Sequence, residues 1–543
     1  MKNYIFYIVI IAVGFMISCD SAAQNERDKT FGEIALEESA TPVRPGIPGE
    51  RPFWNTFAKR FIYAPAFDFK DIDAAVKYRF DLLSLADSST YSFESDKPYA
   101  ALSPVWTKVP VGKVELKVIG VSANGDRLDL AGERHFYRAA PFAGEYHEPL
   151  MSYDSSAMLA LDNLMKEDYV RYWLENGKPD PDYKNYIFAT KIYSALIVGS
   201  ITYARLKEGT TEAERSTLLA KIVADYLIEI SYEKGSVWEF FPPSYHGSYQ
   251  DKSVGDVFKH KPFMLETTNF TIIAADAGHA YLDLYDYTGE TKYLDAAIKI
   301  ARTYQTTQME NGTWYQMVDY KTGEPVVSLI AIPTGVVVFL ERLSRYYGIE
   351  GLEGTAEKAL QWIMENPVKD FHWVGQFEDV TPREPFENLS REQACDLAIY
   401  LLKNKMDQHN SIRLAEELIR FSEDQFVIWE KPMPAKIRKS KGSFTKNWIT
   451  PSVQEQYIYW MPVGRTAGIM LQTYWTAYET TKNEMYLAKA KSIANSFTLV
   501  QKEHNGKYPT YFTRYPVDMW LNSAVYPSKI LMDFDQYLET LNP

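Results

Sequence analysis

Residues 285–301 read YDYTGETKYLDAAIKIA and residues 478–494 read YETTKNEMYLAKAKSIA, and the pattern that these two segments share decides the fold. Tyrosine, leucine, isoleucine and alanine recur at matching places, and Asn311-Gly312 recurs downstream as Asn505-Gly506. Each segment joins two apolar-periodic stretches through a short turn, which is typical of a helical hairpin. Hairpins arrive roughly every 60 to 70 residues, so the two copies lie about three hairpins apart and predict a ring of six.

Helical periodicity continues on both sides of this repeat. Apolar residues keep the spacing of amphipathic helices beyond residue 150, where short turns alternate with long aromatic loops. The sequence therefore predicts a mainly α protein in which residues 146–543 form an (α/α)6 toroid. The expected helices are 184–207, 211–232, 265–286, 290–307, 331–347, 352–365, 389–404, 410–425, 453–480, 483–500 and 522–541.

The preceding region follows the period of β-strands. Hydrophobic and polar residues alternate over 76–80 and 114–118, and a Ser-Ala-Asn-Gly turn occupies 122–125. Such alternation indicates strands with one buried face. Residues 56–145 are therefore expected to form a small antiparallel β-sandwich of the fibronectin or immunoglobulin type.

The first residues have the order of a lipoprotein signal peptide. Lys2 precedes an apolar run over residues 4–17, and Ser18 precedes Cys19. We expect cleavage before Cys19 and lipidation of that cysteine; the alternative is an uncleaved anchor, although the run is shorter than the ~20 residues of a membrane span. Residues 20–55 are expected to be a flexible linker. The prediction is an exported, lipid-anchored protein of the periplasm or outer membrane.

The amino-acid composition limits the classes of molecule that this protein is expected to bind. The formal net charge of −13 argues against nucleic acid, because little would neutralise the phosphate backbone. Aromatic residues make up 15% of the chain, which suits either stacking on sugar rings or a large helical core. Cys395 is the only cysteine after Cys19 and lies in a helical pattern, so it is expected in the core.

Several chemistries have no motif in this sequence. We find no phosphate-binding glycine-rich loop, no His-Glu-x-x-His, no Gly-x-Ser-x-Gly and no EF-hand loop. Neither a cofactor nor a metal is therefore predicted.

A β-rich module followed by an α/α toroid, behind a lipoprotein signal, resembles the six-hairpin glycosidase-like lipoproteins of glycan-degrading Bacteroidetes. The nearest resemblance is to their exo-acting β-glucuronidases, and it extends to toroidal uronate lyases and glucuronyl epimerases. It covers most of the chain beyond residue 55 and rests on architecture. It implies a glycoside hydrolase that cleaves uronate-containing polysaccharide or oligosaccharide with carboxyl groups. The alternatives are a polysaccharide lyase or glucuronyl C5-epimerase using Tyr or His, and a surface lipoprotein that only binds glycan.

Three aromatic loops are candidates for the site. In residues 371–388, Glu378 and Asp379 lie among aromatic residues that would raise a carboxyl pKa, so we expect one of them to be catalytic. The alternative is that they pair with Arg383 while Glu387 and Asn388 cap the next helix. The substrate-binding candidates of this loop are His372, Trp373 and Gln376.

The second loop spans residues 238–249. Trp238 and Tyr245 are candidates for stacking on a sugar, and His246 is a candidate acid or base, although a lone loop histidine is more often a surface residue. Glu266, near the start of the following predicted helix, is a further candidate catalyst or an ordinary helix-start residue.

The third cluster combines residues 447–465 with the late loop 508–515. Tyr457 is the candidate catalyst here, and Arg465 or Arg514 could bind a uronate carboxylate through two hydrogen bonds. Trp448 and Tyr511 are candidates for contact with the sugar, while arginine beside aromatic rings is also an ordinary structural stack.

Overall fold

The computed structural model describes residues 29–53, 56–144, 146–247, 267–378, 382–404, 408–430, 447–515 and 519–541. The predicted lipidation site Cys19 lies outside these ranges, as do the candidate site residues Glu266 and Asp379. Within the described residues, no helix is both long and apolar enough to cross a membrane.

The N-terminal region is β-rich, as expected, and has two layers of unequal size. The larger is a five-stranded sheet in the order β1 (Arg60–Phe61), β7 (Arg127–Arg138), β6 (Gly112–Val121), β3 (Lys77–Ser84) and β4 (Thr90–Ser95). In β3, Tyr78, Phe80 and Leu82 are buried while the intervening residues are more exposed. Only one sheet face is therefore apolar, and it is covered by the pair β2 (Ala66–Phe67) and β5 (Ala100–Ala101) and by the short helix α3 (Ser103–Trp106).

Part of the expected flexible linker is ordered. Residues 31–38 form helix α2 (Phe31–Glu38), which begins with a capping box between Thr30 and Glu33. Downstream of α2, the Arg44 side chain pairs with Glu417 of the toroid at 2.8 Å. The linker expectation is therefore wrong for this part, because local capping and contacts with the body fix the backbone.

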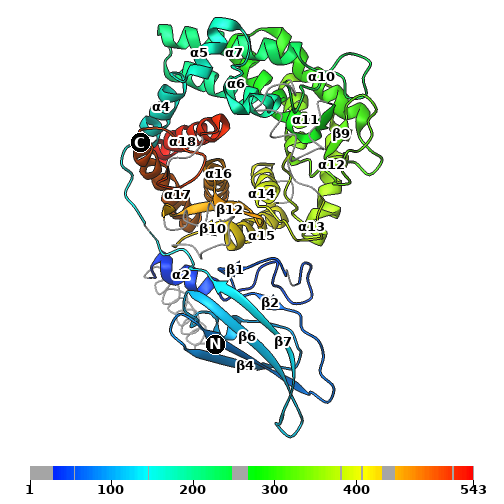
Figure 1. Cartoon of the computed structure of the whole chain (residues 1–543), viewed down its shortest axis with the longest axis vertical. Helices are drawn as coiled ribbons and strands as arrows, with labels where there is room; N and C mark the ends of the chain where they lie inside the picture. The colour runs from blue at the N-terminus through cyan, green and yellow to red at the C-terminus, as the bar shows by residue number, and fades with distance from the viewer. Residues whose placement is uncertain are drawn as a thin grey trace, which may run out of the picture.

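The rest of the described chain forms helical hairpins around a ring (Figure 1). Six hairpins are described, and each places one helix inside the ring and one outside. The pairs, inner helix first, are α6 (Ala189–Leu206) with α7 (Thr211–Glu229), α9 (Ala274–Thr288) with α10 (Thr291–Thr307), α11 (Thr334–Tyr347) with α12 (Glu353–Glu365), α14 (Glu392–Asn404) with α15 (Gln408–Phe426), α16 (Gly464–Thr481) with α17 (Glu484–Glu503), and α18 (Leu521–Leu541) with α4 (Tyr153–Leu164).

Each inner helix contacts the next, and α18 contacts α6, so the ring is closed. The predicted (α/α)6 toroid is confirmed, and the two echoed segments are the hairpins α9–α10 and α16–α17, on opposite sides of the ring. Repeated tyrosine, alanine and isoleucine residues such as Tyr293, Ile300 and Ile493 are buried where outer helices meet inner ones.

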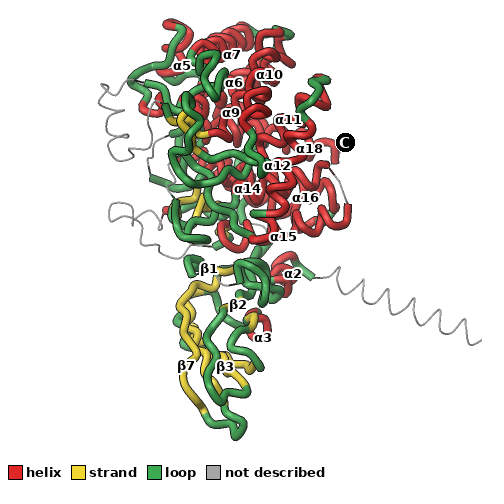
Figure 2. The backbone as a smooth tube through the Cα atoms, turned by 90° about the vertical axis from the view of Figure 1, so that its right-hand side faces the viewer, coloured by secondary structure: helices red, strands yellow, loops and turns green. Residues whose placement is uncertain are grey.

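Two expected helices begin later than predicted. Residues 452–462 contain the strands β11 (Ser452–Gln456) and β12 (Tyr459–Pro462) instead of the start of a helix, because the aromatic and β-branched residues of this stretch favour strands and Pro462 ends the run. Helix α9 begins at Ala274, after the strand β8 (Thr268–Phe270), which pairs with β9 (Met317–Asp319). These short strands lie at one end of the ring (Figure 2).

Candidate active site

The N-terminal ends of all six described inner helices converge on one cavity at the ring axis. This axial cavity has a volume of about 100 Å³. Because each helix begins here, the partial positive charges of the helix dipoles add at this mouth and favour anionic groups. The inner helices contribute Lys191, Asp276, Gly335, Glu392, Gln393, Asp396, Arg465, Asn522 and Ser523.

Two ion pairs cross the axial cavity. Lys191 Nζ of α6 contacts Glu378 Oε1 of the loop before α14 at 2.6 Å. Burial disfavours the charge on Lys191, but the Glu378 carboxylate outweighs it and raises the pKa of Lys191. Arg465 of α16 pairs with Glu392 of α14 at 3.1 Å. Both cations are therefore held charged at the mouth.

Asp276 and Asp396 are further carboxyl groups of the site, and neither forms an ion pair within the described residues. Burial raises the pKa of Asp276 to about 6, against the lowering influence of Arg465. Burial and the nearby Glu392 raise the pKa of Asp396 to about 7, and Asp276 adds to this effect. Both side chains keep some exposure toward the cavity. The site thus holds two carboxyl groups whose pKa values are both raised toward neutrality.

Three buried polar atoms of the lining have no hydrogen-bond partner among the described residues. They are Gln393 Oε1, Asn522 Oδ1 and Ser523 Oγ. Buried polar atoms in folded proteins nearly always have a partner, so these atoms are suited to hydrogen bonds with a bound molecule or water.

The loop that carries Glu378 is fixed by hydrogen bonds to its backbone and side chains. Tyr245 Oη donates to the Glu378 carbonyl at 2.9 Å, and Gln316 Nε2 donates to the Phe377 carbonyl at 3.2 Å. Gln376 Oε1 accepts from the Ile332 backbone N–H at 3.1 Å. The loop is therefore tied to the segments that lead into α9 and α11.

The structure places Glu378, Gln376 and Arg465 in the cavity lining, with Tyr245 directly behind Glu378. The remaining described candidates from the sequence lie away from the lining. Trp373 is fully buried against Phe371, and Trp238 packs on Phe241, so neither ring is available to a sugar. These two expectations are corrected because large aromatic side chains fill the wall of the ring.

The two histidine candidates also lie elsewhere. His372 packs against Phe386, and burial lowers its pKa. His246 contacts Tyr226 Oη at 3.2 Å and lines a separate cavity behind Tyr245. Neither histidine is among the residues that line the axial cavity, so the expected roles as catalyst and sugar contact are not supported by their position.

The third cluster is split by the fold. Tyr457 is buried, stacks on Phe426 and donates to Gln425 Oε1 at 2.9 Å. Trp448 is buried beside Thr513, and Arg514 lies at the surface with Glu503. The Tyr511 ring lies 6.0 Å from the ring of Trp520, which lines the cavity, but Tyr511 itself does not. Of the candidates named in this cluster, Arg465 lines the site, and Glu455 and Val463 of the same stretch line it as well.

Sequence reasoning missed Lys191, Asp276, Asp396 and Trp520. Asp276 and Asp396 lie in Ala-Asp-Ala and Cys-Asp-Leu contexts that are typical of buried helices. The available signal was an ionisable residue in the first two turns of an otherwise apolar helix, since such a charge needs a polar cavity or a partner.

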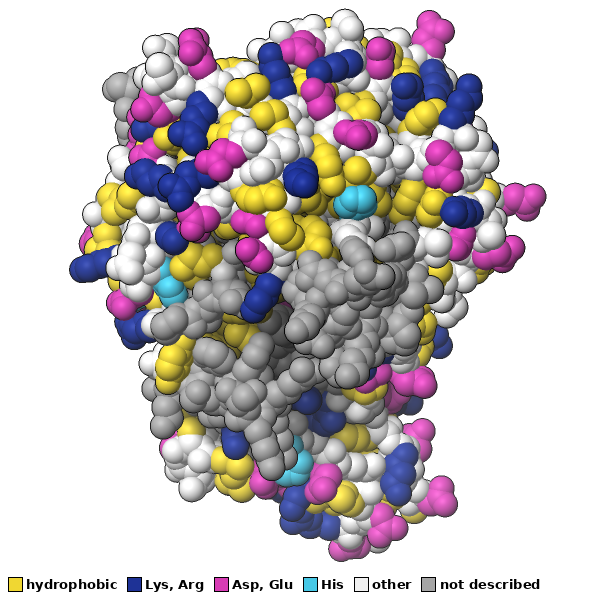
Figure 3. All heavy atoms as spheres, turned by 45° about the horizontal axis from the view of Figure 1, so that its top comes forward, with side chains coloured by type: hydrophobic (Ala, Val, Ile, Leu, Met, Phe, Trp, Pro, Cys, Tyr) yellow, Lys and Arg dark blue, Asp and Glu magenta, His cyan; other side chains and the backbone are white. Residues whose placement is uncertain are grey.

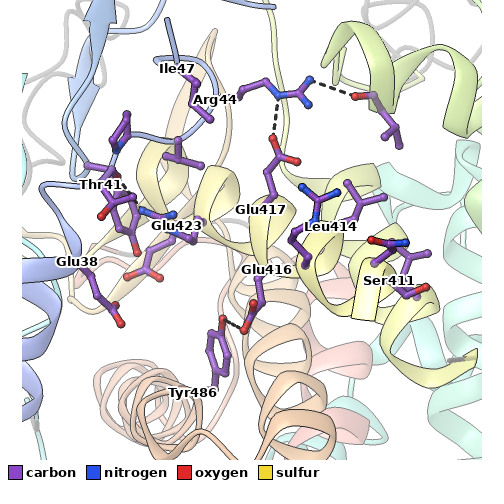
Figure 4. Close-up of a pocket in the computed structure, with 18 of the residues that line it drawn as sticks. Glu38, Thr41, Arg44, Ile47, Ser411, Leu414, Glu416, Glu417, Glu423 and Tyr486 are labelled. Atoms are coloured by element: carbon purple, nitrogen blue, oxygen red, sulfur yellow. Dashed lines mark hydrogen bonds and ion pairs between the residues drawn. The ribbon is translucent and has the colours of Figure 1, made fainter. Parts of the chain in front are cut away.

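A second, larger cavity of about 1090 Å³ lies between residues 38–50 and the outer helices α12, α15 and α17 (Figure 4). We call it the outer cavity. Its charges are largely satisfied by one another: Arg44 pairs with Glu417 at 2.8 Å, and Lys489 pairs with Glu423 at 2.7 Å. Tyr486 Oη donates to Glu416 at 3.5 Å.

No protein-family model matches the sequence, and no curated protein matches it. Among solved structures, the chain is similar to a family 76 glycoside hydrolase from a bovine Bacteroides thetaiotaomicron strain, with 10% identity and a TM-score of 0.48 over 89% of this chain and 98% of that one. It is similar to cellobiose 2-epimerase from Spirochaeta thermophila, with 12% identity and a TM-score of 0.49 over 72% and 98%. It is also similar to an unsaturated glucuronyl hydrolase specific for heparin, with 10% identity and a TM-score of 0.41 over 71% and 97%.

Proposed function

We propose that this protein is a carbohydrate-active enzyme, a β-glucuronidase-like glycoside hydrolase that acts on uronate-containing oligosaccharide or polysaccharide. The observation that carries the proposal is the pair Asp276 and Asp396, with pKa values raised to about 6 and about 7, beside the cations Lys191 and Arg465. Glycoside hydrolysis needs one protonated and one ionised carboxyl group.

We propose one role for each carboxyl group. Asp396, with the higher pKa, keeps its proton at neutral pH more often and donates it to the glycosidic oxygen as the bond to the anomeric carbon breaks. Asp276, with the lower pKa, is more often ionised and serves the anomeric carbon as base for water or as nucleophile. Its negative charge also stabilises the positive charge that develops on the sugar in the transition state.

The cations support a substrate with a carboxylate. Lys191 and Arg465 are already engaged by Glu378 and Glu392, and the axial cavity of about 100 Å³ is smaller than the ~300–1,000 Å³ typical of ligand sites. Because the cavity is too small to hold a sugar beside both ion pairs, the carboxylate of a bound uronate would replace the Glu378 carboxylate on Lys191. The unpartnered oxygens of Asn522 and Ser523 would then face sugar hydroxyls.

The lyase and epimerase alternatives need a tyrosine or histidine base at the sugar. Among the described residues that line the axial cavity there is neither. Figure 3 shows acidic and basic side chains interspersed among the coloured residues of the face that it displays. The lining therefore favours hydrolysis with local recognition of one acidic sugar.

Export and lipid anchoring through Cys19 belong to the same proposal, supported by the order of charge, apolar run and cysteine in residues 1–19. A tether of this kind would hold the enzyme at a membrane where oligosaccharides arrive from outside the cell.

The test is a product analysis with purified protein. We expect a panel of uronate-terminated oligosaccharides to yield reducing sugar without new ultraviolet absorbance, because hydrolysis leaves no unsaturated product. Asp396→Asn should abolish the release, while Asp533→Asn, which alters an exposed pair with Lys529 on α18, should not. New absorbance would establish a lyase instead, and turnover that survives Asp396→Asn would overturn the assignment.

A further inference from the structure

We propose that Gln425 is a positioning residue that couples the docking of the N-terminal sheet to the geometry of the axial cavity. It is the middle member of a buried chain of hydrogen bonds that runs from the residues after β1, through the end of α15, to the segment that begins α14. The effect on catalysis rests on the proposed function, but the mechanical coupling does not.

The first link joins the N-terminal region to the toroid. The backbone N–H groups of Ile62 and Tyr63 donate to Asp424 Oδ1 at 2.6 and 2.8 Å. All three residues are buried, and Asp424 lies near the end of α15. Two backbone donors on one carboxylate oxygen fix the chain that leaves β1 against this helix.

The second link passes through the Gln425 amide. Gln425 Nε2 donates to Asp424 Oδ2 at 2.5 Å, and Gln425 Oε1 accepts from Tyr457 Oη at 2.9 Å. A carboxylate only accepts, so the amide nitrogen must face Asp424 and the amide oxygen must face Tyr457. The orientation of one buried amide therefore depends on both neighbours.

The third link reaches the site. The Tyr457 backbone N–H donates to the Leu389 carbonyl at 3.1 Å, and Asn388 Nδ2 donates to Gln456 Oε1 at 2.7 Å. One residue on, Ser390 Oγ donates to the Glu455 carbonyl at 3.1 Å and accepts from the Glu392 N–H at 3.2 Å.

The contact between Ser390 Oγ and the Glu392 N–H lies at the start of α14. Glu392 pairs with Arg465 in the axial cavity, and Asp396 follows one turn later on the same helix. A shift of β11 would therefore move the first turn of α14 and the carboxyl groups that it carries.

The linked groups come from four distant parts of the sequence and are buried, so no water is at hand to replace a lost partner. Leaving a buried polar group unpaired is costly, and a chain of such bonds responds as a unit. The N-terminal region is thus part of the support of the site, although none of its described residues lines the axial cavity.

The test breaks the hydrogen bond between Gln425 and Asp424 in one variant and rebuilds it in a second. Gln425→Glu sets a second carboxyl group against Asp424, and once both groups are ionised their repulsion breaks the chain at its centre. Combining it with Asp424→Asn gives a new amide whose oxygen accepts from the backbone of Ile62 and Tyr63 and whose nitrogen donates to the carboxylate now at position 425. That carboxylate still accepts from Tyr457, so the double variant rebuilds the chain.

Hydrogen–deuterium exchange on the full chain measures the coupling without a substrate. We expect Gln425→Glu to speed exchange by about tenfold in peptides covering 60–64, 388–392 and 455–458, and the double variant to bring all three back. Tyr457→Phe, which keeps the ring on Phe426, should speed exchange only at 388–392 and 455–458.

Trp106→Phe is the matched control, because Trp106 Nε1 donates to the Ile62 carbonyl at 2.8 Å and has no part in the chain through Asp424. It should loosen 60–64 alone. If Gln425→Glu loosened 60–64 but left 388–392 unchanged, or if the double variant rescued nothing, the inference would be overturned.

Enzyme kinetics test whether the coupling affects catalysis. Given hydrolase activity, Gln425→Glu should lower kcat by about tenfold with a smaller change in KM, and the double variant should restore it. If no glycoside is cleaved by the parent protein, the proposed function fails while the exchange result still decides the coupling.

Discussion

The two cavities of this molecule differ in size by about tenfold, and the smaller one is the proposed site. The outer cavity, about 1090 Å³, is bordered by charges that neutralise one another, as in Arg44 with Glu417. The axial cavity, about 100 Å³, keeps Asp276 and Asp396 without an ion-pair partner among the described residues and raises their pKa values. Unsatisfied electrostatics, more than open volume, distinguish a catalytic site from a gap between elements.

The largest expected effect separates the two cavities directly. Asp396→Asn should lower kcat by about 10²–10⁴-fold, because the amide cannot supply the proton. Glu416→Gln, the same change at a half-buried carboxyl of the outer cavity, should leave kcat within about twofold. Initial rates at saturating substrate measure both, and equal losses would erase the distinction.

A second pair of variants tests the cations. Lys191→Gln should raise KM for a uronate substrate by about 10- to 100-fold with little change in kcat, since a charged hydrogen bond to the substrate carboxylate is lost. Glu378→Gln should lower KM, because Glu378 no longer competes for Lys191. A rise in KM in both variants would mean that the ion pair is structural.

The pH profile sharpens the assignment of the two carboxyls. The proposed roles require Asp276 to be ionised, above a pKa of about 6, and Asp396 to be protonated, below a pKa of about 7. The profile of kcat/KM should therefore be a narrow bell that falls about tenfold per pH unit on each side. Asp396→Asn should remove the alkaline limb from any residual activity; a limb that persists belongs to another group.

The smallest expected effect is on thermal stability. Here Asp396→Asn is expected to be favourable, whereas in the first prediction the same variant lowers kcat. A carboxyl with a raised folded pKa contributes most to stability below the unfolded pKa of about 4, and this contribution is lost as pH rises through about 7. Asp396→Asn should therefore raise the unfolding temperature at pH 8 by about 1–3 °C and lose that advantage at pH 4. Scanning calorimetry at both pH values measures it, with Asp533→Asn as the neutral comparison.

The ring could be predicted from the sequence because a helical hairpin is a local pattern and its repetition is visible, as in Tyr293 and Tyr486. Most of the site could not. Lys191, Asp276 and Asp396 are far apart in sequence and meet only when the ring closes.

The sequence around the site residues was also misleading about their role. Asp276 and Asp396 sit between buried neighbours such as Ala275 and Cys395, so their surroundings are typical of core helices. The aromatic loops were conspicuous, but Trp373 and Trp238 support the wall of the ring. Glu378, Gln376 and Arg465 were found because loops that precede inner helices must end at the mouth.

The closure of the ring by α4 and α18 has a consequence for biosynthesis. Helix α18 supplies Asn522 and Ser523 to the axial cavity and also packs against α4, which is made much earlier. A nascent chain that lacks α18 therefore has an open ring and an incomplete site, however much of it has already left the ribosome. The axial cavity is therefore completed in one late step, after most of the chain has been synthesised.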